Sequence, residues 1–137
     1  MKRSIVISIK PEFADLIFSG EKSVELRRAI PKDVPSSTEI YIYASSPIQS
    51  IVGKAEIKRV EAHPLNKLWE KIGDKAGISV DYFNKYFDGK EVGYGLVLNN
   101  VKKFSSPFHL RSLKKHFNFH PPQSYMYTTP DLLSYLS

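Results

Sequence analysis

The sequence predicts an α+β fold: a small β-barrel of five or six mostly antiparallel strands with short helices at its periphery. Several runs of strand length are rich in β-branched and aromatic residues, and they either alternate in polarity or are continuously apolar. The helical patterns between them are short and irregularly placed, which argues against a doubly wound parallel sheet. Gly93-Tyr94-Gly95 lies inside a strand pattern rather than at a helix start, so a glycine-rich nucleotide loop is not expected.

Length and composition predict a single domain, residues 1–137, in the cytoplasm. Of the 137 residues, 42% are hydrophobic and 12% aromatic, which is enough for one core and too much for a disordered segment. No apolar run approaches the roughly 18 residues of a membrane span and no signal-peptide pattern is present, so we expect no membrane contact. The lack of cysteine excludes disulfides, thiolate zinc sites and cysteine nucleophiles. The four histidines lack metal-ligand spacing, and we expect neither a metal nor another cofactor.

The first part of the chain predicts a strand, a helix and a second strand. Residues 4–10 are β-branched at nearly every position, as in a largely buried strand. Pro11 suits the first position of a helix, and Gly20 suits its left-handed cap. Residues 22–28 alternate with period two, so we expect a half-buried strand.

The remaining elements follow from the same kinds of signal. We expect a bend at Gly53, near the start of a long strand, and Ser79 is a good N-cap for a helix. The other expected strands span residues 39–45, 51–62, 92–104 and 125–127. The other expected helices span residues 65–72, 80–87 and 109–117, with a helical turn over 131–136.

The densest polar cluster lies on the second expected strand. A turn at Gly20 delivers Lys22 to the start of this strand, and alternation places Glu25 and Arg27 together on its non-core face. A carboxylate accepts hydrogen bonds from exocyclic amines and a guanidinium binds phosphate or guanine, so the cluster indicates a nucleobase or phosphate site. A desolvated Lys22 beside Arg27 could instead act as a base or nucleophile. A third interpretation is an exposed strand with an ordinary Glu–Arg pair.

Residues 8–14 and 17–28 resemble the opening signature of the ASCH domain family, a member of the PUA-like superfamily of small RNA-binding β-barrels. The family pattern is a strand, a helix and then Gly-x-Lys-x-x-Glu-x-Arg, filled here by Gly20, Lys22, Glu25 and Arg27. Weaker similarities to the same family follow at residues 42–47, 51–53 and 93–96. The resemblance therefore covers most of the chain. It implies a PUA-like barrel with a cleft beside the first helix that accepts RNA or a modified nucleoside.

Members of this family are described as RNA-binding proteins, ribonucleases or amidohydrolases of N4-acetylcytidine. The amidohydrolases use a lysine, a threonine three residues later and a distant glutamate. This sequence keeps the lysine as Lys22 but has Glu25 in place of the threonine, and Ser23 is the nearby hydroxyl. We therefore expect an RNA- or nucleoside-binding pocket. The alternative is a hydrolase of RNA or nucleosides in which Lys22, Glu25 and Ser23 are catalytic and Glu25 activates water.

Other residues are candidates for contacts with the RNA or nucleoside. Lys10 ends the first strand, where its ammonium suits a phosphate; a solvated strand end is the alternative. Tyr41 and Tyr43 share one strand face and would either stack a base or fill a second, aromatic core. Ser45 extends that face, and a constrained loop near residue 123 would either close over a ligand or cap the sheet. The remaining candidate contacts are Arg28, Gln123 and Ser124.

The positive charge is unevenly distributed along the chain. The formal net charge is +6, yet residues 1–91 are nearly balanced, with 15 basic and 13 acidic groups, whereas residues 92–130 hold five basic residues and no acidic one. In the expected helix 109–117, helical spacing points Arg111, Lys114 and Lys115 outward as a ridge for the phosphate backbone of RNA. The alternatives are a solubilising face or a module that binds another protein.

Overall fold

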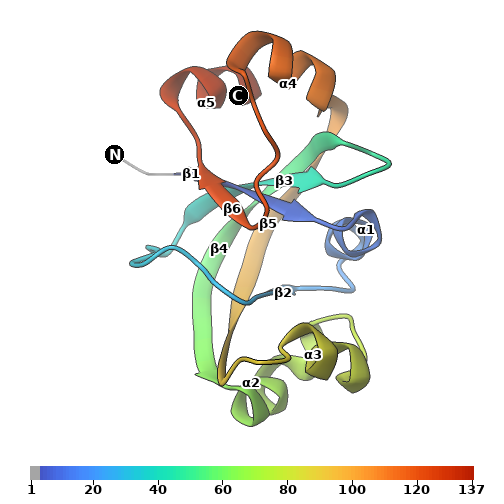
Figure 1. The fold of residues 1–137 in the computed structure, drawn as a ribbon, viewed down its shortest axis with the longest axis vertical. Helices are drawn as coiled ribbons and strands as arrows, with labels where there is room; N and C mark the ends of the chain where they lie inside the picture. Colours follow the sequence, from blue (N-terminus) through green and yellow to red (C-terminus); the bar gives the residue numbers. More distant parts are fainter. Residues whose placement is uncertain (1–3) are drawn as a thin grey trace.

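In the computed structural model, which describes residues 4–137, six strands form one curled mixed sheet (Figure 1). The strands are β1 (Ser4–Ile9), β2 (Val24–Arg27), β3 (Thr38–Ala44), β4 (Ser50–Pro64), β5 (Val92–His109) and β6 (Tyr125–Tyr127). Their order across the sheet is β2-β5-β4-β3-β1-β6. The β1–β3 pair is parallel and every other pair is antiparallel. The α+β fold predicted from the sequence, a small barrel of mostly antiparallel strands with short peripheral helices, is confirmed, and the sheet curls into a half-barrel.

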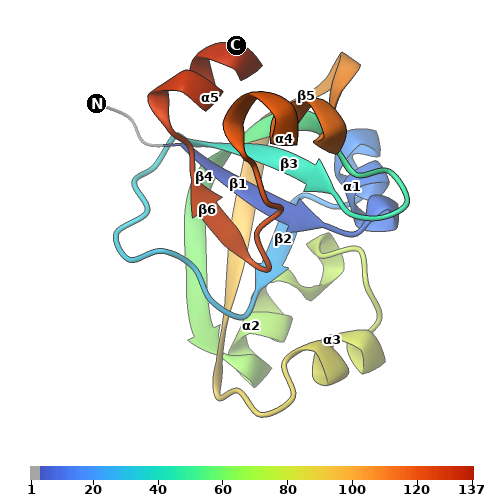
Figure 2. The ribbon, with the colours of Figure 1, turned by 45° about the horizontal axis from the view of Figure 1, so that its top comes forward.

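Short helices lie at the two ends and along one side of the sheet (Figures 1 and 2). They are α1 (Pro11–Ser19), α2 (Leu65–Ile72), the short 3₁₀ turn η1 (Gly73–Lys75), α3 (Val80–Tyr86), α4 (Leu110–Phe117) and α5 (Pro130–Leu136). Local sequence signals define several of their ends. Pro11 begins α1, Gly20 ends it with φ +87°, and the Ser79 hydroxyl accepts a hydrogen bond from the Tyr82 backbone N–H at 3.1 Å. No helix within residues 4–137 is long and apolar enough to cross a membrane.

Strands β4 and β5 form a long bent ribbon that spans the molecule. The predicted irregularity at Gly53 is confirmed, because the β4–β5 register shifts between Ile51 and Gly53. A Cβ atom at Gly53 would lie 2.5 Å from both the Lys102 carbonyl oxygen and the Phe18 ring, so this close approach requires glycine. Strand β5 runs five residues further than predicted, to His109, because its end pairs with the start of β4 at Ser50.

Three apolar clusters hold these elements together. The first lies on the concave face, between the sheet and α1, and contains Ile7, Ile17, Ile42 and Leu96. The second lies on the opposite face of β1 and β3, where α4 and α5 cover it. The third fixes α2, η1 and α3 against β2 through Leu26, Leu68 and Phe83. The third cluster positions α3 beside β2, which is the arrangement that creates the pocket described below.

Strand β2 differs from its predicted half-buried state, because all four of its residues are buried. Val24 and Leu26 pack into the third apolar cluster, as their alternation predicts. Glu25 and Arg27 point the other way, yet α1, β1 and α3 enclose that side as well. An edge strand of four residues thus carries two buried charges.

Candidate functional site

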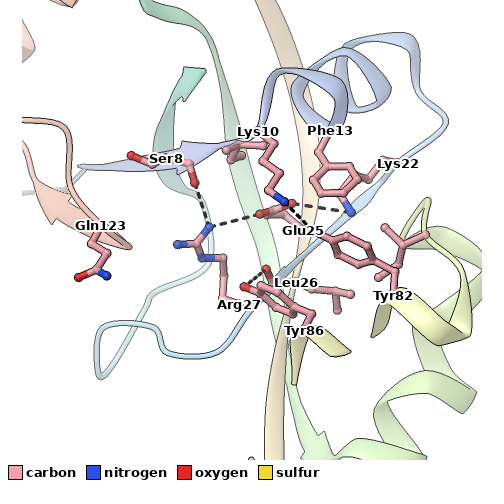
Figure 3. A pocket seen from close by; sticks show the side chains of 12 residues that line it. Ser8, Lys10, Phe13, Lys22, Glu25, Leu26, Arg27, Tyr82, Tyr86 and Gln123 are labelled. Atoms are coloured by element: carbon pink, nitrogen blue, oxygen red, sulfur yellow. Dashed lines mark hydrogen bonds and ion pairs between the residues drawn. The ribbon is translucent and has the colours of Figure 1, made fainter. Parts of the chain in front are cut away.

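A pocket of about 200 Å³ opens at the seam of the half-barrel, where the edge strand β2 approaches β1 and the loop before β6. Side chains of β2 and of Lys22, two residues before it, form its floor. Its walls come from the end of β1, from α1, from α3 and from the loop containing Gln123 (Figure 3). Of the residues predicted to contact a ligand, Lys10, Lys22, Glu25, Arg27 and Gln123 line this pocket. The short motif Gly-x-Lys-x-x-Glu-x-Arg thus supplies three of the residues that line one pocket, Lys22, Glu25 and Arg27.

A buried carboxylate between two cations forms the floor. Lys22, Glu25 and Arg27 are 3%, 6% and 8% exposed, respectively. Lys22 Nζ lies 3.8 Å from Glu25 Oε1, and Arg27 Nη1 lies 3.4 Å from Glu25 Oε2. Each carboxylate oxygen therefore faces one cation, and the three groups carry a net positive charge when all are ionised.

Backbone from two distant segments holds Lys22 in place. Its N–H donates to the Leu16 carbonyl at 3.0 Å, and its Nζ donates to the Ala76 carbonyl. Gly77 follows with φ +66°, and a Cβ there would lie 3.2 Å from Lys22 Cβ. The turn after η1 thus packs directly on the lysine stem. Lys22 Nζ also lies 5.1 Å from the centroid of the Phe13 ring, within cation–π range.

Burial shifts the proton affinities of the floor in opposite directions. Burial raises the pKa of the Glu25 carboxyl because the ionised form loses its water, and the nearby Lys22 and Arg27 cations oppose this rise. Burial lowers the pKa of the Lys22 amine for the same reason, and the Glu25 charge opposes that fall. Burial thus favours the uncharged form of both groups, and their mutual attraction favours the charged forms.

The Arg27 guanidinium donates its hydrogen bonds to other groups of the protein. Nη1 donates to the Ser8 carbonyl at 3.2 Å, and Nη2 donates to the Ser124 carbonyl at 2.9 Å and to Ser124 Oγ at 3.0 Å. Ser8 and Ser124 lie across the seam from β2. The guanidinium therefore closes the back of the pocket and fixes the Glu25 carboxylate, rather than pointing a free fork at a ligand.

An aromatic wall faces this charged floor. The Phe13 ring of α1 meets the Tyr82 ring of α3 edge-on, with centroids 5.3 Å apart. Tyr82 in turn stacks on Tyr86 at 6.4 Å with an interplanar angle of 16°. Tyr86 Oη donates to the Leu26 carbonyl at 3.0 Å, which ties the wall to β2. At the rim, the exposed Lys10 places Nζ 3.4 Å from Tyr82 Oη.

Sequence reasoning did not identify this wall. Tyr82 and Tyr86 are four residues apart on a helix, so they share one face, and Phe13 lies in the first turn of the helix next to the signature motif. That i, i+4 tyrosine pair was the available signal. What the sequence alone lacked was the position of α3 against β2, which rests on long-range packing.

Comparisons with known proteins show which family the chain belongs to. The profile of the family described as "Domain of unknown function (DUF365)" matches residues 3–115. An "ASCH domain-containing ribonuclease" of Zymomonas mobilis is 38% identical over 125 residues, which cover 90% of this chain and 82% of that protein. The chain belongs to the ASCH domain family. The crystal structure of ASCH from Zymomonas mobilis has a TM-score of 0.90 and 36% identity, covering 97% of this chain and 92% of that one.

More distant structures share the fold of this ASCH domain. The N-terminal domain of Staphylothermus marinus McrB has a TM-score of 0.60 at 13% identity and covers 96% of this chain and 91% of that one. At that identity the likeness concerns the fold alone.

Two predicted ligand contacts of the ASCH domain lie in its core instead. Tyr41 and Tyr43 are 1% and 3% exposed and belong to the second apolar cluster. Their rings pack near Phe104 and Phe119, with centroid distances of 6.4 and 5.9 Å, respectively. The stacking role predicted for them is wrong, because α4 and α5 cover this face of β3. Of the two interpretations that the sequence allowed, the aromatic second core is the observed one.

Three further candidates lie outside the pocket lining. Arg28 is exposed and donates to the carbonyls of Tyr86 at 2.6 Å and Asp88 at 3.1 Å, so it anchors α3 to the end of β2. Ser45 continues from β3, where its N–H donates to the Ile9 carbonyl at 3.0 Å. Ser23 bonds through its backbone, to the Lys75 carbonyl and the Leu98 N–H, both at 3.0 Å. These residues support the elements around the pocket.

The remaining candidates fall into two groups. Ser124 is held against Arg27 behind the pocket floor. Arg111, Lys114 and Lys115 are exposed on α4, at the other end of the molecule from α2 and α3 (Figure 1). Within residues 4–137, no three histidine or acidic side chains gather in a way that could hold a metal ion.

Proposed function

We propose that this ASCH domain binds RNA or a nucleoside by holding one base in the seam pocket. The observation that carries this proposal is the pairing of an aromatic wall with a buried Lys–Glu–Arg floor in a cavity of about 200 Å³. A volume of this size suits a single base with part of its sugar and is too small for a folded RNA element. Aromatic side chains stack any base, whereas charged groups on one side fix its orientation.

Each part of the pocket has a distinct task in this proposal. The Tyr82 ring stacks on the base, and the Glu25 carboxyl hydrogen-bonds to its polar edge. Lys10 is exposed at the rim and binds the phosphate or sugar that stays outside. Arg27 is a positioning residue, because its donors already bind Glu25, Ser8 and Ser124.

A second candidate function is hydrolysis of the bound RNA. The 38% identical relative is named a ribonuclease, and the pocket holds a carboxyl and an amine 3.8 Å apart. In such a reaction the ribose 2′-OH passes its proton to the Glu25 carboxylate while the 2′-oxygen forms a bond to phosphorus. The bond from phosphorus to the 5′-oxygen breaks, and that leaving oxygen takes a proton from the Lys22 ammonium. On an acylated nucleoside the same pair would instead activate water against the amide.

Binding is tested with short single-stranded RNA and with free nucleosides by titration calorimetry. The parent should bind at least one of the two, and Glu25→Gln should lower that affinity about tenfold or more, because a group hydrogen-bonded to the base is changed. Lys67→Ala, an exposed lysine of α2 outside the pocket lining, is the control and should leave the affinity unchanged. Binding that survives Glu25→Gln unaltered, or no binding to either ligand at low salt, would overturn the proposal.

Hydrolysis is tested separately by turnover of single-stranded RNA and of N4-acylated cytidine. If the second candidate is correct, the parent cleaves one of them and Lys22→Ala abolishes the cleavage while the circular-dichroism spectrum is retained. Turnover that persists in Lys22→Ala assigns the chemistry to other residues. Binding without turnover leaves the first candidate alone.

A further inference from the structure

A basic surface on α4 remains outside the pocket and has no role in the function proposed so far. Arg111, Lys114 and Lys115 are all exposed and project from the same helix, and we call these three residues the α4 ridge. The stretch 92–130 that contains them has no acidic residue. A surface of one sign attracts polyanions, above all nucleic-acid phosphates.

The packing of α4 leaves the ridge side chains available. Leu113 is buried in the second apolar cluster, and Leu110 and Phe117 pack against the same cluster, so the helix is anchored by its other face. Within the described chain, the ridge side chains form no ion pair or hydrogen bond with the protein. Cations without a carboxylate partner remain ready to neutralise an external anion.

The chain itself connects the ridge to the pocket. Helix α4 is capped by Asn118, which has φ +52°, and the following segment descends to β6 beside the seam (Figure 2). Phe119 anchors this segment in the second cluster, Gln123 lines the pocket, and Ser124 binds Arg27. Gln123 is eight positions after Lys115, the last ridge residue, and such a length of chain spans at most about 28 Å when extended. A strand of a few nucleotides covers such a distance.

We propose that the α4 ridge binds the phosphates of the RNA strand that flank the base held in the pocket. This inference rests on the proposed function and specifies it, because it makes single-stranded RNA, rather than a free nucleoside, the ligand class. The pocket would select the base, and the ridge would add affinity that depends on the salt concentration and not on the sequence.

The test compares two variants from which the same charge is removed. The ridge variant carries Arg111→Gln, Lys114→Gln and Lys115→Gln. The control variant carries Lys32→Gln, Lys67→Gln and Lys90→Gln, three exposed lysines on a loop, on α2 and in a turn. Each is titrated at several salt concentrations with a single-stranded RNA of about ten nucleotides, a length within the site sizes of single-strand binders, and with a nucleoside monophosphate.

The ridge variant should lower the slope of log affinity against log salt for RNA by about 2, or about 0.7 for each phosphate that the protein no longer neutralises. Its affinity for the monophosphate should equal that of the parent, and the control variant should keep the parent's slope. If the slope falls equally in both variants, the effect comes from the net charge of the protein and not from the ridge, and the inference is overturned. An unchanged slope in the ridge variant would also overturn it, and ridge-dependent binding of polyglutamate would then assign the surface to an acidic protein.

The two proposals fail in distinguishable ways. Binding of the monophosphate without binding of RNA overturns the role of the ridge and leaves the pocket function standing. Failure of both probes overturns the pocket function itself.

Discussion

Arg27 and Ser124 join the two edges of the curled sheet. Arg27 ends β2, whose one neighbour in the described sheet is β5, and Ser124 directly precedes β6, whose one neighbour there is β1. Within residues 4–137 no strand pairing connects these edges, so the seam is crossed by side chains. Arg27 Nη2 donates to the Ser124 carbonyl at 2.9 Å and to its Oγ at 3.0 Å, and Nη1 reaches the Ser8 carbonyl at 3.2 Å. These contacts of Arg27, which lines the pocket, link the two edges of the sheet.

Replacing Arg27 should destabilise the protein strongly. In Arg27→Met the Glu25 carboxylate stays buried with Lys22 as its one remaining cation, at 3.8 Å, and the acceptors across the seam are left without their donor. Breaking a buried ion pair from one side costs about 3–5 kcal/mol. The free energy of unfolding in urea should fall by that amount. Ser124→Ala removes only one of the acceptors and should cost about 1 kcal/mol.

Arg28→Met is the matched control for this experiment. Arg28 is the next residue, is exposed, and donates to two carbonyls of the α3 end rather than across the seam. Hydrogen bonds at an exposed site contribute less, so the substitution should cost about 1 kcal/mol or less. Equal destabilisation by the two variants would show that Arg27 has no special role at the seam.

A second ion cluster, which is not part of the pocket lining, should make stability depend on acidic pH. On β4, Glu61 accepts from Arg59 Nε at 2.8 Å and lies 2.8 Å from His63 Nε2. These hydrogen bonds lower the pKa of Glu61 to about 2. Since the folded pKa is below the unfolded value, this contribution to stability is present above pH 4.5 and is lost as the pH falls toward 2.

Glu61→Gln should therefore reduce the melting temperature at pH 6 and have little effect near pH 2. The contribution should not exceed about 1 kcal/mol, because the Arg59 side chain is 51% exposed. Glu70→Gln, an exposed residue of α2, controls for the removal of one surface carboxylate. A difference between parent and Glu61→Gln that grows as the pH falls would contradict the prediction.

Tyr82 of α3 should determine the affinity for a base. Tyr82→Ala removes the ring that faces the floor, and one base–aromatic stack is worth about 1–3 kcal/mol, or roughly a 5- to 150-fold change in the dissociation constant. Tyr82→Phe keeps the ring and removes the hydroxyl that lies 3.4 Å from Lys10 Nζ, so its affinity should stay near that of the parent. Tyr135→Ala, on α5, is the control. If the parent and Tyr82→Ala bind the base with equal affinity, Tyr82 does not stack on it and the prediction is wrong.

Local signals account for what the sequence predicted correctly. Pro11, Gly20 and Ser79 define helix ends through backbone preferences and caps that depend only on neighbouring residues. Lys22, Glu25 and Arg27 were predicted to form one cluster because a turn at Gly20 delivers Lys22 to the start of the strand on which Glu25 and Arg27 share a face. Neither prediction required knowledge of long-range packing.

The features that were predicted wrongly or missed all depend on packing between segments far apart in the sequence. Whether the Tyr43 face of β3 is free or covered depends on α4 and α5, which follow it by more than 60 residues in the sequence. Tyr82 and the Ala76 carbonyl reach the pocket from a segment more than 50 residues after Lys22. The half-burial predicted for β2 fails for the same reason, because α1 and α3 enclose its second face.

The buried floor of the pocket should lower stability as the pH rises above 4.5. Burial raises the pKa of Glu25 above its ordinary value of 4.5, so the folded state retains a proton that the unfolded chain releases. The corresponding stability is present below pH 4.5 and is lost as the pH rises through the folded pKa. Burial lowers the pKa of Lys22 from 10.5, so the folded state releases the Lys22 proton at a lower pH than the unfolded chain does. The stability of the protein therefore increases again as the pH rises toward 10.5.

Urea unfolding of the parent and of Glu25→Gln between pH 4 and 9 tests this behaviour. The parent should lose stability relative to the variant as the pH increases from 4.5, since the glutamine has no proton to release. Lys22→Met should remove the recovery on the alkaline side. If the parent instead gains stability relative to Glu25→Gln over this range, the two cations 3.4 and 3.8 Å from the carboxylate outweigh its burial, and Glu25 is a fixed anion rather than a group that exchanges protons.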